Sequence, residues 1–113
     1  MIHQFAYFKI YEEKLHNALE CIKNFVLKVH ANEVNTILYI SLQSQENKLE
    51  FTHYIIFKDE EAENYHKNTF WVKEFVDQLY PLYEIQPKFI KQNLLVPSIY
   101  DVKFKFEMVK SRK

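Results

Sequence analysis

The apolar residues of this chain change their spacing in a definite order, and that order limits the fold more than any other feature. Residues 2 to 11 are rich in aromatic and β-branched side chains, which predicts a strand. From Lys14 onward the apolar residues recur every three or four positions, as on one face of a helix that ends near His30. Two strand-like runs follow, residues 34 to 42 and 49 to 57, and the polar stretch between them favours a hairpin. The first half of the chain therefore reads strand, helix, strand, strand.

The second half continues with a helix and a strand. Asp59 can cap the start of a helix, and the glutamates after it suit the positive end of the helix dipole. The predicted helix ends at Pro81, and its apolar face consists of Ala62, Tyr65, Thr69, Val72, Val76 and Leu79. Residues 88 to 96 are the fourth predicted strand. We therefore expect an α+β domain of the ferredoxin-like type, βαββαβ, with an antiparallel sheet.

A second periodic signal lies at the C-terminus. Apolar and charged residues alternate there, and the apolar ones are Tyr100, Val102, Phe104, Phe106 and Met108. A period of two predicts an extra C-terminal strand with one apolar face. This strand could lie on the sheet of a partner subunit or extend the edge of its own sheet. We divide the chain accordingly into a domain of residues 1–96 and an extension of residues 97–113.

The chain carries more apolar surface than a small monomer easily buries. Of its 113 residues, 48% are hydrophobic and 17% are aromatic. The third predicted strand is apolar on both faces, with Phe51, Ile55 and Phe57 on one and Tyr54 and Ile56 on the other. Both faces of the sheet should therefore be covered. Helices can cover one face, and we expect the other to be covered by a second copy, so the predicted partner is the protein itself, as a homodimer.

Charge and composition exclude several other classes of partner. The chain has 15 basic and 15 acidic residues, so we expect no nucleic acid partner and no attraction to an anionic membrane surface. No apolar run has the length of a membrane span, and the N-terminus lacks the pattern of a signal peptide, so we expect a cytoplasmic protein. The single Cys21 offers no intramolecular disulfide, and the absence of glycine rules out glycine-rich phosphate-binding loops.

The histidines are the residues best suited to proton transfer. His66 falls at the boundary of the apolar face of the second helix, where it could contact a substrate or could simply be packed and hydrogen-bonded. His53 is expected to be enclosed, because it lies on a strand whose two faces are both apolar. The remaining histidines, His3, His16 and His30, have no ligand spacing, so no metal site is predicted.

Several segments together resemble a known family. They are the run from Glu33 to Tyr39, Phe51, the run from Phe57 to Ala62, and then His66, Thr69, Trp71 and Phe75. This pattern is similar to that of the antibiotic biosynthesis monooxygenase (ABM) family, over residues 1 to about 96. The resemblance implies ferredoxin-like protomers that pair through their sheets into a dimeric α+β barrel. A haem-degrading branch of similar layout uses an iron-ligating histidine where this chain has Val76, so haem breakdown is disfavoured.

The resemblance also implies a chemistry. It is the oxidation of a small aromatic or quinol by molecular oxygen, without a metal, flavin or other cofactor. In this scheme His66 is the catalytic residue, as proton acceptor or hydrogen-bond anchor, and Tyr39, His53, Phe57 and Trp71 are the predicted substrate-binding residues. Two alternatives remain open at the level of sequence. One is a non-catalytic dimeric barrel that binds a small apolar ligand, and the other is an oligomerisation module without an enclosed pocket.

Overall fold

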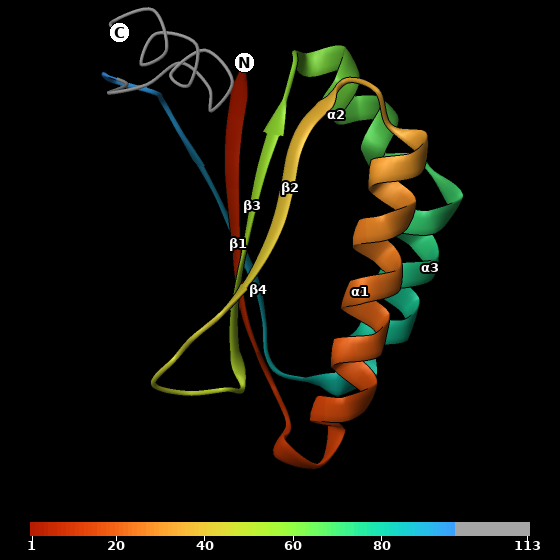
Figure 1. Ribbon diagram of the computed structural model, residues 1–113, viewed down its shortest axis with the longest axis vertical. Helices are drawn as coiled ribbons and strands as arrows, with labels where there is room; N and C mark the ends of the chain where they lie inside the picture. Colours follow the sequence, from red (N-terminus) through yellow and green to blue (C-terminus); the bar gives the residue numbers. More distant parts are fainter. Residues whose placement is uncertain (97–113) are drawn as a thin grey trace, which may run out of the picture.

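Four antiparallel strands and a layer of helices make up the computed structural model, which describes residues 1–96. The strands are β1 (Ile2–Ile10), β2 (Thr36–Gln43), β3 (Glu50–Phe57) and β4 (Tyr83–Gln92), and they lie in the order β2-β3-β1-β4. The helices are α1 (Leu15–Asn32), α2 (Glu60–Lys67) and α3 (Phe70–Leu79). All of them lie on the same side of the sheet (Figure 1). The predicted ferredoxin-like architecture is confirmed; the predicted extra C-terminal strand and the extension 97–113 lie outside the described residues.

The core lies between the sheet and the helices. Alternate residues of β1, including Phe8 and Ile10, point toward the helices, and α1 meets them with Phe25 and Val29. Phe25 also stacks on Phe75 of α3, with ring centroids 3.9 Å apart. Burial of this kind stabilises a domain by roughly 1.5–3 kcal/mol per large side chain. The sheet and both long helices are therefore held in one packed unit.

The second predicted helix is in fact two helices. α2 ends at Lys67, and α3 begins after Thr69, whose hydroxyl oxygen accepts a hydrogen bond from the backbone N–H of Val72 at 3.3 Å. This threonine is a helix cap, which a single amphipathic stripe does not reveal. The break changes which residues face the sheet: Tyr65 and Val76, predicted on the apolar face, are exposed, whereas His66 and Phe75 are buried.

The fourth strand begins earlier than predicted. It runs from Tyr83 to Gln92 rather than from residue 88, and Pro87 lies inside it. Proline is tolerated there because β4 is an edge strand that pairs with β1 alone. The earlier start brings Tyr83 beside Phe8, with ring centroids 5.3 Å apart. An aromatic residue that sequence analysis left outside the sheet therefore joins the core.

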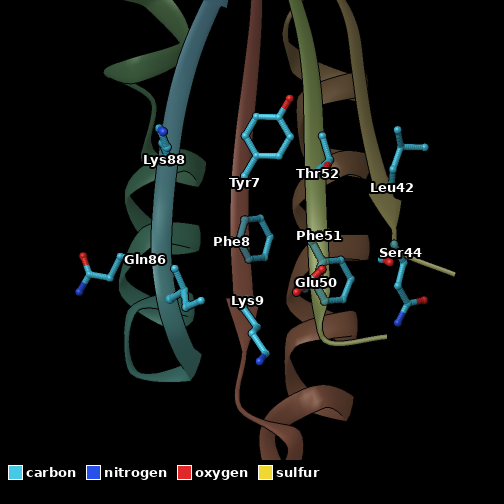
Figure 2. A pocket seen from close by; sticks show the side chains of 12 residues that line it. Tyr7, Phe8, Lys9, Leu42, Ser44, Glu50, Phe51, Thr52, Gln86 and Lys88 are labelled. Carbon is cyan, nitrogen blue, oxygen red and sulfur yellow. The ribbon is translucent and has the colours of Figure 1, made fainter. Parts of the chain in front are cut away.

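The face of the sheet opposite the helices is apolar, and no helix within residues 1–96 covers it. One row of paired residues crosses all four strands and consists of Ile40, Tyr54, Phe5 and Ile90. The next row consists of Leu42, Thr52, Tyr7 and Lys88, and Figure 2 shows these side chains on the viewer's side of the strands with the helices behind. An open trough of about 510 Å³ lies along this end of the sheet. We call this surface the open face.

Candidate functional site

A cavity of about 270 Å³ lies between the sheet and α3. Much of its wall is aromatic, contributed by Phe8, Phe25, Phe75, Tyr80, Tyr83 and Phe89. Tyr39, His53 and His66 also line it, so three of the predicted site residues come together in one place. No lysine, arginine, aspartate or glutamate of the described part of the chain lines this cavity. Its wall therefore favours an uncharged aromatic occupant.

His66 is held by a buried carboxylate. Its Nδ1 lies 2.7 Å from Oε1 and 2.9 Å from Oε2 of Glu33, the residue that ends α1. Glu33 is 5% exposed and His66 is 9% exposed, so this contact is shielded from water. The local reason for the pairing is that α2 packs beside the turn between α1 and β2. The other ring nitrogen, Nε2, has no hydrogen-bond partner within residues 1–96.

Glu33 accepts two further hydrogen bonds. The Thr36 hydroxyl donates to Oε1 at 2.6 Å, and the Trp71 indole N–H donates to Oε2 at 2.5 Å. Burial alone raises the pKa of Glu33, but the hydrogen bonds from His66, Thr36 and Trp71 outweigh it, so the pKa is lowered from its ordinary value. Glu33 is therefore an ionised carboxylate whose lone pairs are used by neighbouring donors.

His53 forms a second buried network on the same wall. Its Nδ1 lies 2.8 Å from the Tyr39 hydroxyl, and its Nε2 lies 2.9 Å from the Ser41 hydroxyl. Burial lowers the pKa of His53 to about 4, so the ring is neutral at physiological pH. Burial also raises the pKa of Tyr39 and Tyr83, so both phenols keep their protons. The polar groups here are uncharged hydrogen-bonding groups rather than ions.

The burial of neutral His53 makes stability depend on pH. The folded-state pKa of about 4 lies below the ordinary value of 6.5, so its contribution is complete above pH 6.5 and is lost as the pH falls to about 4. The expected loss is on the order of 3 kcal/mol in the free energy of unfolding. Urea denaturation at a series of pH values measures it. His53→Gln, which cannot titrate, should show a clearly flatter dependence, and an unchanged slope would contradict this account.

Two of the predicted site residues do not line the cavity. Phe57 is buried in the core beneath α2 and touches the His66 ring, with centroids 5.2 Å apart. Trp71 binds Glu33 instead of facing the cavity. Phe57 thus contacts His66 itself, and Trp71 contacts the carboxylate that binds His66. The sequence analysis gave no role to Glu33 or Tyr83, because a glutamate at a helix end usually faces solvent and Tyr83 was placed before the strand.

The described part of the chain contains neither a cluster of metal-binding side chains nor a helix that could span a membrane. Within residues 1–96, no three histidine, cysteine, aspartate or glutamate side chains come together as metal ligands would. No helix in that range has the length and apolar character needed to cross a membrane.

Comparison with known proteins points to one family. A family model described as antibiotic biosynthesis monooxygenase matches residues 1–78. No curated protein matches the sequence significantly. Many solved structures match the fold, at identities that establish the fold alone.

Three of these structures illustrate the match. A protein from Bacteroides thetaiotaomicron, named as a candidate antibiotic biosynthesis monooxygenase, aligns with a TM-score of 0.81 at 17% identity over 88% of this chain and 94% of its own. A protein of the same description from Nitrosomonas europaea aligns with a TM-score of 0.77 at 18% identity, over 85% of this chain and 100% of its own. A conserved protein from Methanosarcina mazei aligns with a TM-score of 0.77 at 20% identity, over 83% of this chain and 92% of its own. Because the family model covers more than half of the sequence, this chain belongs to the antibiotic biosynthesis monooxygenase family.

Proposed function

We propose that the protein is a cofactor-independent monooxygenase that oxidises a small hydroxylated aromatic, such as a quinol, with molecular oxygen. The observation that carries the proposal is the placement of His66 in the wall of an aromatic cavity, with Nδ1 bound to buried Glu33 and Nε2 without a partner among residues 1–96. A histidine in this setting can accept the proton of a phenolic hydroxyl. Family membership supports a monooxygenase-like role in general.

The size and lining of the cavity support a substrate of one or two rings. Its volume of about 270 Å³ lies just below the usual range of ligand sites, which typically span about 300–1,000 Å³. Aromatic walls favour a flat ring, and the neutral state of His53, Tyr39 and Tyr83 offers no ion to pair with a charged group. We therefore expect uncharged hydroquinones and phenols to be accepted in preference to aromatic carboxylates.

The proposed reaction balances without an added reductant. A ring C–H bond of the quinol is replaced by a C–O bond to one atom of O₂, and the ring is oxidised to a hydroxyquinone. The second oxygen atom leaves as water with two hydrogens from the substrate. The substrate therefore supplies all the electrons that reduce oxygen. The role of the protein is to remove the first proton through His66 and to keep the electron-rich anion in a dry cavity.

The active form is proposed to be a homodimer in which two open faces pack together. Support comes from the apolar row of Ile40, Tyr54, Phe5 and Ile90, which in one chain has nothing packed against it within residues 1–96. A two-fold pairing places the same surface on both sides, so an apolar row can meet an apolar row. A second copy is thus the occupant whose chemistry fits this face best.

A bulky substitution at the exposed edge of the cavity tests whether the reaction takes place inside it. Val76 lines the cavity and is half exposed, so Val76→Trp adds bulk there without overfilling the core. Asp77→Trp, on the exposed side of the same helix, is the matched control. With an oxygen electrode and a panel of hydroquinones, wild type and Asp77→Trp should consume oxygen above the protein-free blank. Val76→Trp should lose at least about 90% of this rate, because a misplaced substrate loses most of the advantage of orientation.

Two outcomes of that experiment count against the proposal. Equal rates for wild type and Val76→Trp would place the reaction elsewhere. Saturable binding of hydroquinones by the wild type with no oxygen uptake would favour the non-catalytic ligand-binding barrel.

A further inference from the structure

We infer that Glu33 is a positioning residue, which fixes the tautomer of His66 so that Nδ1 carries the proton and Nε2 is left as the acceptor of a ring that lines the cavity. The catalytic purpose of this role rests on the proposed function. The tautomer itself follows from hydrogen bonds alone and does not depend on any activity. Glu33 itself does not line the cavity.

The hydrogen-bond inventory around the carboxylate determines the tautomer. An indole N–H can only donate, so Oε2 of Glu33 must accept from Trp71. The lowered pKa of Glu33 keeps both oxygens ionised and therefore able only to accept. His66 Nδ1 lies within 2.9 Å of both oxygens, so this nitrogen must be the donor. In a neutral ring the other nitrogen is then an acceptor, which is the state that a proton-accepting histidine requires.

The surroundings fix the direction of the carboxylate as well as its charge. Glu33 begins the turn after α1, and its backbone N–H donates to the Val29 carbonyl at 2.9 Å. Thr36 on β2 and Trp71 on α3 bind its side chain from two other elements. The carboxylate is therefore held by hydrogen bonds from elements other than α2, which carries His66. The imidazole is held at one nitrogen and confined by the Phe57 ring.

The arrangement also favours proton transfer once a substrate is bound. When Nε2 takes a proton, the ring becomes a cation, and the adjacent carboxylate stabilises that charge at a contact shielded from water. Glu33 itself stays ionised throughout. A residue that only braced the fold would not need to be a carboxylate facing the imidazole, so the two roles can be separated by experiment.

The test is the protonation pattern of the His66 ring, read from long-range ¹H–¹⁵N NMR spectra at about pH 8, where free histidine is neutral. The His66 signals are identified by their loss in His66→Gln. We expect the Nδ1–H tautomer in the wild type. In Glu33→Gln the amide N–H₂ can donate to Nδ1, so the Nε2–H tautomer should dominate. Trp71→Phe keeps the carboxylate and removes only an indole donor, so it should retain the wild-type tautomer.

Several results would overturn the inference. An Nε2–H ring in the wild type would do so without any variant, which keeps the proposal testable if Glu33→Gln does not fold. An unchanged tautomer in folded Glu33→Gln would also overturn it. With an accepted quinol, Glu33→Gln should lower kcat by about 10- to 100-fold with little change in KM. The NMR result bears on Glu33 and the oxygen-uptake assay on the reaction, so the two proposals can fail separately.

Discussion

Replacing His66 by glutamine is expected to lower the rate of oxygen consumption by about 10²–10⁴-fold, the range usual for loss of a general base. Glutamine is similar in length and can donate an N–H to Glu33, so the buried carboxylate keeps a partner. It has no basic nitrogen, however, and cannot accept the phenolic proton. KM should change little, because the aromatic wall that binds the ring is untouched.

The matched control for this variant is His30→Gln. His30 is an exposed histidine in the last turn of α1, outside the cavity lining. It should retain the wild-type rate and the wild-type free energy of unfolding. If His66→Gln keeps most of the activity while remaining folded, His66 is not the proton acceptor.

Replacing Ile40 by glutamate is expected to convert the proposed dimer into monomers. Ile40 is 36% exposed in the single chain and begins the apolar row across the open face. In a two-fold dimer the substitution occurs twice, and each buried, unpaired carboxylate costs several kcal/mol. The dissociation constant should therefore rise by at least about 1,000-fold. Light scattering over a range of concentrations should show the mass of two chains for the wild type and of one chain for Ile40→Glu.

The control for the open face is Leu27→Glu. Leu27 is 65% exposed on α1, in the helical layer on the opposite side of the sheet, and it gains the same charge. It should remain a dimer. A wild type that is a single chain at micromolar concentration would remove the support for pairing through the open face, and so would an Ile40→Glu variant that stays dimeric.

The fold was largely predictable because local patterns decide it. Few topologies fit the aromatic and β-branched runs over β1 and β3 together with the helical spacing after Lys14. Two predictions were wrong, the single second helix and the start of the fourth strand at residue 88. In both places the local residue pattern is compatible with more than one structure. Thr69 serves as a cap inside an apparently continuous helix. Pro87 looks like a strand boundary but lies in an edge strand, which tolerates it.

The site was less predictable, because its central contact joins distant parts of the chain. His66 and His53 were candidates because of their residue type, their positions on the predicted elements and the family resemblance. The partner of His66 could not be found in this way, since Glu33 lies 33 positions earlier in the chain and follows a helix end, where glutamates normally face water. Its burial depends on Thr36 and Trp71, which supply hydrogen bonds only after the three elements have packed. A pattern of spacing along the sequence does not contain that information.

We propose above all that the aromatic cavity beside His66 carries out oxygenation of a small hydroxylated ring. The direct measurement is the mass of the product formed from a hydroquinone by the wild-type protein under ¹⁸O₂. We expect a hydroxyquinone that carries one labelled oxygen atom, formed with His30→Gln and not with His66→Gln. A product without the label, or labelled product at the same rate with His66→Gln, would contradict the account.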